Sequence, residues 1–386
     1  MPKQVQQPKV ALVYDRVNTA FGGAEDVLLA LHTAYPKAPL YTAVYDPKKA
    51  TWAKVFPLVK PSFLNKFPWL NKLHRWIPFL MPIAFESFDF SSYDIIISIT
   101  SAEAKGILTL PHQLHVCYLL TPPRYLYQDR EHSLQSHYIF KIPGMKWLAE
   151  KLLNYLTWWD QQAIFRPDTI IPISQRVGQR IKKYYPNIKA TTVIYPPVTM
   201  ASLDKENNIR IENQPTNYLL MVSRLVSYKH LEQAIVACNN LKKNLVIVGD
   251  GPERKKLQTF FTNYTFWYPF ISETKLHTLY TQCDALLMPG EEDFGIVGLE
   301  ANSYGKPVLV NCKSGVAECI DHTFHGIHIS QEKTAEIEKA IISLENTKFN
   351  PSQLIHNAKK YDTNTFVQQF TQVVQYNWQQ KQKETL

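Results

Sequence analysis

The chain has 386 residues, a hydrophobic content of 45% and a charged content of 19%, which fit a globular protein long enough for two domains. Its formal net charge of +9 predicts an anionic partner, such as nucleic acid, an anionic membrane or a phosphorylated small molecule. Long Lys/Arg tracts and zinc-finger spacings are absent, so we do not expect nucleic-acid binding.

The five cysteines are scattered and include no Cys-x-x-Cys pair, which predicts reduced thiols in a cytoplasmic protein. The first stretch, MPKQVQQPKVALVYD, has no long apolar core, so we expect no signal peptide. The longest apolar stretch, Trp76–Phe85, is short and interrupted by Pro78 and Pro82, and we do not expect it to cross a bilayer.

Short apolar runs alternate with longer helix-like segments along the whole chain. This alternation predicts parallel sheets covered by helices on both faces. The runs that we predict as strands are Val10–Tyr14, Asp94–Ser98, His115–Leu119, Thr169–Ile173 and Val193–Tyr195, followed by Tyr218–Ser223, Leu245–Gly249, Asp284–Met288 and Pro307–Asn311.

Residues 201–216 are polar and lack periodicity, so we interpret them as a linker. We predict an α/β protein with one Rossmann-like domain at 1–200 and a second at 217–362, whose parallel sheets face each other across a cleft. The last segment, 363–386, is expected to form a helix, clearest over Thr365–Gln382, that packs back toward the first domain.

Residues 47–85 contain no acidic residue and interleave basic with aromatic side chains. This pattern suits peripheral contact with a membrane, and it equally suits core aromatics with solvated lysines. The residues concerned are Lys48, Lys49, Lys54, Lys60, Lys66, Lys72 and Arg75 with Trp52, Phe56, Phe63, Phe67, Trp69, Trp76 and Phe79.

Three strand ends in the second half carry residues that suit a phosphate ligand. Arg224 and Lys229 follow the strand at 219–223, where ligand sites of open α/β sheets lie, and two cations there can hold a diphosphate. Gly249 and Gly251 end the next strand and allow close backbone approach, although no dinucleotide fingerprint is present. Taken alone, the two cations could be ordinary surface residues and the two glycines could belong to an ordinary turn.

The third strand end is the stretch PGEEDFGIVGLE. Gly295, Ile296 and Val297 are expected to open a helix whose free amides form an anion site. Glu292 then precedes the helix and Glu300 lies about one turn inside it, so the two need not form an acid/base pair. Near the amino terminus, Gly22 and Gly23 repeat the pattern of strand, loop and helix.

Together these motifs resemble the glycosyltransferase family 4 group of GT-B enzymes. The resemblance rests on SRLVSYKHLEQAI, LVIVGDGPERKKL, MPGEEDFGIVGLEANSYGKPVLV and GVAECI. FGGAE, SYDIIIS, HVCYLLTPPRYLY, WWDQQAI and ISQRVGQRIKKYY in the first half are similar to mannosyltransferase-like members that build bacterial surface polysaccharides.

The resemblance implies a retaining, metal-independent hexosyltransferase without a cofactor, using a nucleotide-diphospho-sugar donor. GDP-mannose is the donor it suggests, with a lipid-linked or glycan acceptor and a place at the inner face of the plasma membrane. It also implies that Arg224 and Lys229 neutralise the diphosphate and that Glu292 binds the transferred sugar. Glu300 would bind the ribose. The other implied donor contacts are Gly22, Gly23, Gly249, Gly251, Phe294, Gly295, Ile296 and Val297.

In the first half, Leu120 stands where relatives often carry His, and Arg124 and Tyr125 are the acceptor-binding candidates. The departure at Leu120 keeps two alternatives open. One is a non-catalytic nucleotide-sugar-binding scaffold, and the other is a GT-B-fold epimerase.

Overall fold

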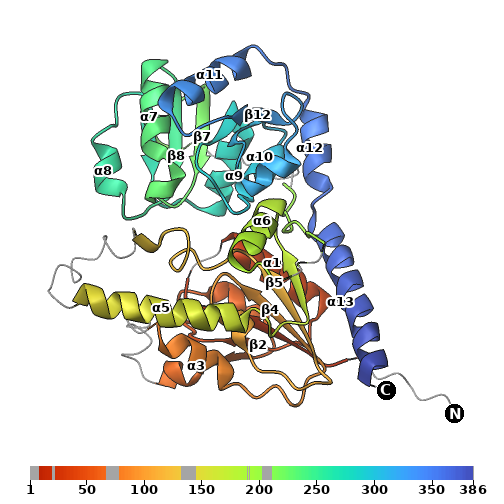
Figure 1. The fold of residues 1–386 in the computed structure, drawn as a ribbon. Helices are drawn as coiled ribbons and strands as arrows, with labels where there is room; N and C mark the ends of the chain where they lie inside the picture. Colours follow the sequence, from red (N-terminus) through yellow and green to blue (C-terminus); the bar gives the residue numbers. More distant parts are fainter. Residues whose placement is uncertain are drawn as a thin grey trace. The chain divides into compact units, whose positions relative to one another are not determined.

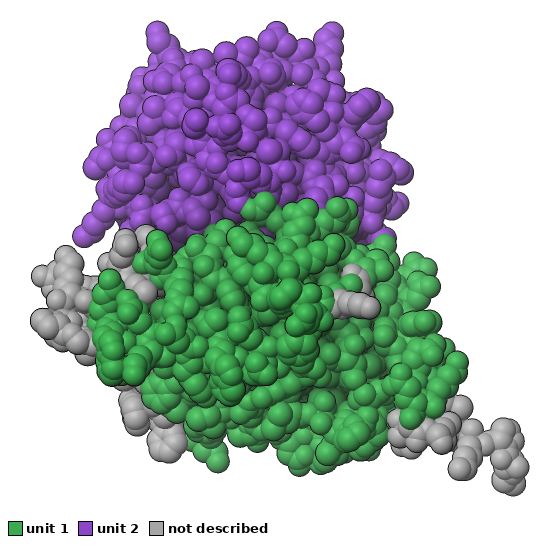
Figure 2. All heavy atoms as spheres, viewed as in Figure 1, with its two compact units in different colours: residues 1–195, 366–386 green, residues 196–365 purple. Residues whose placement is uncertain are grey.

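The structure, a computed structural model, describes residues 8–19, 22–66, 78–131, 145–188, 190, 192–201 and 211–385. The chain divides into two compact units, which Figure 2 shows in different colours. Unit 1 comprises residues 1–195 and 366–386, and unit 2 comprises residues 196–365. The greater part of the predicted linker, 202–210, lies outside the described residues.

Unit 1 is built on a six-stranded parallel sheet in the order β3-β2-β1-β4-β5-β6 (Figure 1). Strand β1 lies at the centre between β2 and β4, with Leu12 opposite both Leu40 and Ile97. The strands are β1 (Val10–Tyr14), β2 (Leu40–Thr42), β3 (Val59–Pro61), β4 (Ile95–Thr100), β5 (Leu114–Leu119) and β6 (Thr169–Pro172).

The helices of unit 1 include the last helix of the chain. Phe366 and Phe370 of α13 pack edge-on against Tyr118 of β5, with ring centroids 5.7 Å apart in both pairs. The carboxyl end of this helix is tied to the same sheet, because Lys381 pairs with Asp168 at 2.6 Å. The helices are α1 (Gly23–Ala34), α3 (Leu80–Glu86), α5 (Met145–Ala163), α6 (Gln175–Tyr184) and α13 (Thr363–Thr385).

Unit 2 repeats the architecture with a parallel sheet in the order β12-β11-β10-β7-β8-β9. Its strands are β7 (Tyr218–Val222), β8 (Asn244–Val248), β9 (Thr265–Tyr268), β10 (Ala285–Met288), β11 (Val308–Asn311) and β12 (Gly326–Ile329). Its helices are α7 (Leu231–Asn240), α8 (Arg254–Gln258), α9 (Glu273–Gln282), α10 (Val297–Ser303), α11 (Thr334–Glu345) and α12 (Pro351–Lys359).

The sheet of unit 2 is buried on both faces, which explains its nearly continuous apolar strands. Leu219 and Met221 belong to the core cluster that includes residues of α7 and α11. Leu220 points to the opposite face and is also fully buried. The expected α/β architecture with two parallel sheets is therefore confirmed.

All but one of the predicted strands are present, with small shifts at their ends. The prediction at Val193–Tyr195 is wrong. Ile194 does lie against β5, since its carbonyl accepts a hydrogen bond of 2.7 Å from the Tyr118 hydroxyl. The segment runs into Pro196 and Pro197, however, and proline has no N–H to donate to a strand ladder.

The basic and aromatic segment at 47–85 contributes mainly to the core of unit 1 where the structure describes it. Phe56 is buried, Phe63 packs against the core cluster and the Trp52 ring donates to the Thr19 carbonyl at 3.2 Å. Of the aromatics in this segment that the structure describes, Phe79 alone is exposed, at 41%. Phe67, Trp69, Lys72, Arg75 and Trp76 lie outside the described residues.

All five cysteines are free thiols, and four of them are buried. Within the described ranges, no helix combines the length and the apolar character that a membrane span requires.

Candidate active site

The carboxyl edge of the unit 2 sheet brings together the loops that carry the predicted donor site. Strand β7 is flanked by β8 on one side and β10 on the other. The strand order therefore reverses at β7, because β8 and β9 are added on one side of it and β10 to β12 on the other. Open parallel sheets bind ligands at the carboxyl ends of the strands at such a point. The loops that follow β7, β8, β10 and β11 all begin at this edge.

The loops after β7 and β8 are in close backbone contact, and glycine makes this possible. Gly249 has a φ of +133°, and a Cβ there would lie 2.1 Å from the Ser223 carbonyl oxygen. A Cβ on Gly251 would lie 2.3 Å from the Leu225 carbonyl oxygen. The glycines predicted to contact a donor thus also fix the loop on which Arg224 lies.

The loop after β10 is held by side chains from the loop after β11. The Asn311 amide donates to the Pro289 carbonyl at 2.8 Å, and the Ser314 hydroxyl donates to the Gly290 carbonyl at 3.0 Å. The same hydroxyl accepts the amide of Glu292 at 3.0 Å. The motif reading of the sequence did not assign these two positioning residues, and the only signal for them is their place at the end of a predicted strand.

Lys229 and Glu292 form an ion pair in which both side chains are largely buried, at 14% and 18% exposed. The loops meet closely here as well, because a Cβ on Gly290 would lie 2.6 Å from the Lys229 Cα. Arg224 is exposed on the same edge, and its side chain forms no ion pair within the described part of the chain. Of the two predicted diphosphate-binding cations, Lys229 is therefore neutralised by a carboxylate, and Arg224 has no carboxylate partner among the described residues.

The turn between Glu292 and Glu300 begins the helix that the sequence predicts. Helix α10 starts at Val297, after Gly295 with a φ of +96°. Among the described residues, the amides of Gly295, Ile296 and Val297 have no hydrogen-bond acceptor. The Phe294 side chain is only 4% exposed, so it packs beneath this turn.

Glu300 lies in the first turn of α10 and has its own partner. The Tyr280 hydroxyl donates to the Glu300 carboxylate at 2.9 Å, and the Tyr280 ring stacks on Tyr304 with centroids 5.0 Å apart. Burial raises the pKa of the Glu300 carboxyl above its usual value, and the hydrogen bond from Tyr280 opposes that shift. Glu292 and Glu300 therefore have different hydrogen-bond partners.

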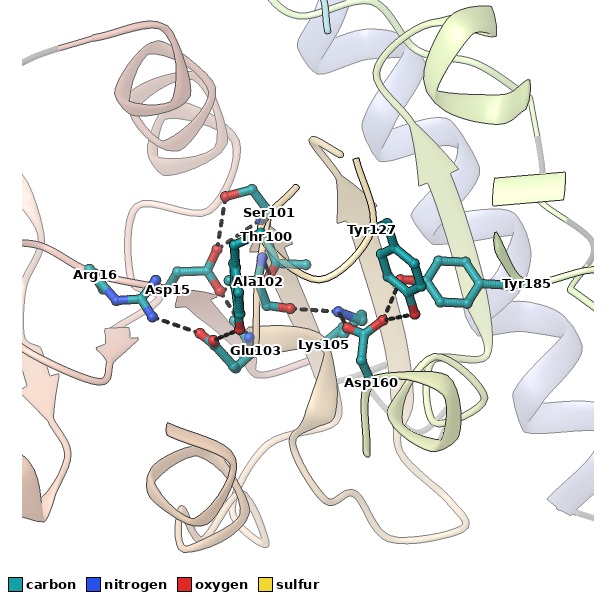
Figure 3. A network of polar contacts seen from close by, with 12 residues as sticks. Asp15, Arg16, Thr100, Ser101, Ala102, Glu103, Lys105, Tyr127, Asp160 and Tyr185 are labelled. Atoms are coloured by element: carbon teal, nitrogen blue, oxygen red, sulfur yellow. Dashed lines mark hydrogen bonds and ion pairs between the residues drawn. The ribbon is translucent and has the colours of Figure 1, made fainter. Parts of the chain in front are cut away.

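The carboxyl edge of the unit 1 sheet carries a second polar cluster (Figure 3). The Asp15 carboxylate follows β1 and accepts hydrogen bonds from the Thr100 hydroxyl at 2.7 Å and the Ala104 amide at 2.9 Å. Arg16 pairs with the buried Glu103 carboxylate at 2.9 Å. These contacts fix the loop after β4 against the end of β1.

The acceptor candidates lie in the neighbouring loop. The Arg124 guanidinium pairs with Asp129 at 3.1 Å, and the Tyr125 hydroxyl donates to Glu103 at 2.8 Å. Leu120 directly follows β5, and His115 within that strand is buried with its pKa lowered to about 3 by desolvation. His115 is therefore a neutral core residue.

Gly22 and Gly23 belong to unit 1, where Gly22 precedes α1. The Glu25 carboxylate accepts a hydrogen bond from the Gly22 backbone, as in a capping box. This gives the Gly-x-x-Glu pattern a local role. A contact of the two glycines with a donor stays a prediction.

A buried ion pair lies behind the carboxyl edge of the unit 1 sheet, and the sequence did not predict it. Lys105 and Asp160 are 0% and 1% exposed and lie 2.5 Å apart. The hydroxyls of Tyr127 and Tyr185 donate to the same Asp160 carboxylate at 2.8 Å and 2.5 Å. Figure 3 shows Asp160 pointing toward Lys105 and both tyrosine rings, so the pair ties α5 to the loop after β4.

The two Rossmann-like units define a GT-B fold, and solved structures agree along nearly the whole chain. The apo form of the lipopolysaccharide outer core galactosyltransferase WaaB covers 96% of this chain and 99% of its own, with a TM-score of 0.64 at 18% identity. Anabaena HepE in complex with UDP covers 95% of this chain and 100% of its own, with a TM-score of 0.65 at 18% identity. A sucrose-phosphate synthase from Thermosynechococcus elongatus covers 96% and 99%, with a TM-score of 0.70 at 14% identity.

Residues 204–361 match the family model described as Glycosyl transferases group 1. This match covers the whole carboxyl edge of unit 2, where the predicted donor-site residues lie.

Curated relatives agree with this class over part of their length. An uncharacterised glycosyltransferase of Methanocaldococcus jannaschii is 29% identical over 37% of this chain and 39% of its own. The N,N'-diacetylbacillosaminyl-diphospho-undecaprenol alpha-1,3-N-acetylgalactosaminyltransferase of Campylobacter jejuni is 24% identical over 52% of this chain and 53% of its own. The chain thus spans about half or less of the length of these relatives.

Proposed function

We propose that the protein is a retaining hexosyltransferase of family 4 that moves a sugar from a nucleotide-diphospho-sugar to a lipid-linked or polysaccharide acceptor, without a metal or cofactor. The observation that carries this proposal is the carboxyl edge of unit 2. There Arg224 and Lys229 lie on the loop after β7, and Glu292 and the α10 turn follow β10. This edge lies wholly within the region that matches the glycosyltransferase model.

The Lys229–Glu292 pair suggests how donor binding is coupled to sugar recognition. A diphosphate offers Lys229 a stronger counter-charge than a single carboxylate does. When Lys229 turns to the diphosphate, Glu292 is released to accept hydrogen bonds from sugar hydroxyls. In each state Lys229 has an anionic partner, and the Glu292 carboxylate always has hydrogen-bond donors, so neither group is left without a partner at a largely buried position.

Arg224 supplies the charge that the protein does not already neutralise. Its exposed guanidinium can approach a diphosphate as a two-pronged donor, and the negative charge on the diphosphate grows as the bond to the sugar breaks. The chemistry then rests on stabilising the leaving group and aligning the acceptor, with no covalent nucleophile. The amides of Gly295, Ile296 and Val297 add neutral donors on the phosphate side.

The two candidate classes of donor are GDP-mannose and UDP-sugars. The first half of the chain favours GDP-mannose through its mannosyltransferase-like motifs. HepE was solved with UDP and with UDP-glucose, and the Campylobacter relative is named for transfer of N-acetylgalactosamine. The relatives therefore make a UDP-sugar the main competitor of GDP-mannose.

The acceptor is proposed from chemistry shared with relatives. The Campylobacter relative is named for a sugar linked to diphospho-undecaprenol, which is a lipid-anchored acceptor. An acceptor of this kind would place the enzyme at the inner face of the plasma membrane, with Arg124 and Tyr125 as the candidate contacts in unit 1.

A thermal-shift screen with GDP-, UDP-, dTDP- and ADP-sugars tests the donor site, because a ligand that binds only the folded state raises the melting temperature. We expect one nucleotide class to raise it, and transfer of its sugar to a lipid-linked acceptor to follow. Absence of a shift with every nucleotide sugar would overturn the proposal. Binding without turnover would favour a scaffold, and a converted donor without any acceptor would favour an epimerase.

A further inference from the structure

Helix α5 carries large apolar side chains on its solvent-exposed face. Trp147, Leu148 and Trp158 are 59%, 55% and 58% exposed, and Tyr155 is 43% exposed. A tryptophan is seldom left this accessible on a soluble surface, because its ring has a large apolar area. Two exposed tryptophans and a tyrosine on one helix therefore require an explanation.

These side chains form a single stripe along the helix. At 3.6 residues per turn, positions 147, 151, 155 and 158 fall on one side, and 148 lies at its edge. Tyr155 and Trp158 are in contact, with ring centroids 6.2 Å apart. Figure 1 shows α5 at the outer edge of unit 1, with its first turns reaching beyond the rest of the described unit.

The opposite side of α5 is fixed in the core of unit 1. Leu156, Trp159 and Ala163 are buried, and the Trp159 ring nitrogen donates to Glu86 at 2.8 Å. Asp160 on the same side forms the buried pair with Lys105. A rigid helix that is apolar on both sides is normally covered on both sides, so the stripe predicts a partner.

The charges beside the stripe favour a lipid surface over a protein. Lys146 and Lys151 are exposed on the helix, and the Lys151 ammonium lies 4.4 Å from the centre of the Trp147 ring. Apart from the buried Asp160, the acidic residue of α5 itself is Glu150, on the far side of Trp147 from Lys151 and paired with Lys146 at 4.0 Å. Trp, Tyr and Lys together are typical of a membrane interface, whereas lysine is depleted from protein interfaces.

We propose that the stripe formed by Trp147, Leu148, Lys151, Tyr155 and Trp158 is a membrane-docking surface that lies in the headgroup region of an anionic bilayer. The rings enter the boundary between headgroups and acyl chains, and the lysine reaches the lipid phosphates. This surface is separate from the segment at 47–66, whose aromatic side chains are wholly or partly buried. Membrane docking would bring the protein close to the lipid-anchored acceptor of the proposed function. The docking proposal itself depends only on the exposed residues of α5 and not on that function.

Flotation with lipid vesicles tests the proposal without any sugar substrate. The full chain is mixed with neutral phosphatidylcholine vesicles or with vesicles that also contain phosphatidylglycerol. We expect tighter binding to the anionic vesicles, weakened by added salt. The double variant Trp147→Ser/Trp158→Ser should bind at least ~10-fold more weakly, since each lost ring removes apolar area from the interface.

A matched control removes two exposed aromatics from unit 2. Phe270 and Phe324 are 81% and 65% exposed, so the variant Phe270→Ser/Phe324→Ser should bind vesicles as the unmodified chain does. The melting temperature of both double variants should stay unchanged, because all four side chains face solvent.

Three results would overturn the proposal. The first is unchanged flotation of the α5 variant, and the second is equal loss in the unit 2 control. The third is concentration-dependent dimerisation that the α5 substitutions abolish, because it would assign the stripe to a second copy of the chain. The thermal-shift response to nucleotide sugars is measured separately, so failure of the docking surface and failure of the proposed function remain distinguishable.

Discussion

At Lys229 the protein supplies its own counter-ion, and this arrangement shapes what substitutions at the site should do. The ammonium and the Glu292 carboxylate are largely buried together on loops that hydrogen bonds and close glycine contacts hold in place. Arg224 has no such partner within the described residues. The two cations are therefore unequal, and Arg224 is the more available one for a ligand.

Arg224→Ala should lower turnover by at least ~10²-fold, the scale observed when a main stabiliser of developing charge is lost. Steady-state transfer with the donor found by the screen measures this effect. Lys339→Ala provides the control, since it removes an exposed cation of α11 that pairs with Glu336 and with no residue of the candidate site. A normal rate in the Arg224 variant with a donor that is demonstrably used would contradict the assigned role.

Glu292 and Glu300 should separate in kinetics as they do in structure. Glu300→Gln should weaken donor binding by ~10-fold, the scale of one charged hydrogen bond to a ribose hydroxyl. Glu292→Gln should mainly slow transfer, since its carboxylate is proposed to act on the sugar. Donor titration and single-turnover rates measure the two effects, and the reverse pattern would reject the division of roles.

Glu300→Gln should also stabilise the fold at neutral pH. The carboxyl has a pKa raised above its ordinary value of 4.5, so the folded state holds the proton more tightly than the unfolded state. That stability is complete below the ordinary value and is lost as pH rises through the raised one. The variant cannot ionise, so its melting-temperature advantage should grow as pH rises above 4.5 and should level off once the carboxyl of the unmodified protein is fully ionised.

Thermal unfolding of both proteins across that pH range measures the advantage, with the exposed Glu131→Gln as the control. An advantage that is constant with pH would show that ionisation of Glu300 is not its cause.

The charged site residues that follow strands could be predicted from the sequence. The polar residues that hold their loops in place could not. Arg224, Lys229 and Glu292 are charged and follow apolar strands, which marks them in the sequence. Asn311 and Ser314 are small polar residues of a kind found in any turn, and only the structure shows that they hold the Glu292 loop.

At the scale of elements, the buried Lys105–Asp160 pair joins α5 to the loop after β4. Lys105→Met or Asp160→Asn alone should cost about 3–5 kcal/mol, because each leaves one charge buried without its partner. The double variant removes both charges and keeps an amide oxygen for Tyr127 and Tyr185, so its loss should be clearly smaller than the sum. Urea unfolding of the four proteins measures the coupling energy.

Additive losses of unfolding free energy in the two single variants and the double variant would mean that the two charges do not depend on each other.

The sequence gives no sign of the Lys105–Asp160 pair, because lysine and aspartate are ordinarily solvent-exposed. The same limit applies to the exposed stripe of α5, since apolar periodicity in a sequence does not tell which of two apolar faces is covered.

Strand prediction succeeded for eight strands and missed β2, β3, β9 and β12. Strands β1, β4, β7 and β10 are apolar because helices cover both faces of their sheets. Strands β2 and β3 have three residues each, and β3 reads Val-Lys-Pro, so neither carries a pattern that can be recognised.

At the scale of the whole molecule, the chain leaves unit 1 at residue 195 and re-enters it at residue 366. Phe370 is fully buried against β5, so Phe370→Ala should destabilise unit 1 by about 3–5 kcal/mol. Hydrogen exchange should then accelerate in β5 and remain unchanged in β7 of unit 2. Faster exchange in both sheets would show that the units unfold as one.

The return of α13 to unit 1 sets an order for folding during synthesis. Unit 2 is continuous in sequence, so its residues are all available once Thr365 has left the ribosome. Unit 1 cannot bury Tyr118 beneath Phe366 and Phe370 until the final segment has emerged. The half of the protein translated first is therefore completed last, and its nascent sheet waits through the translation of about 170 residues with one apolar surface uncovered.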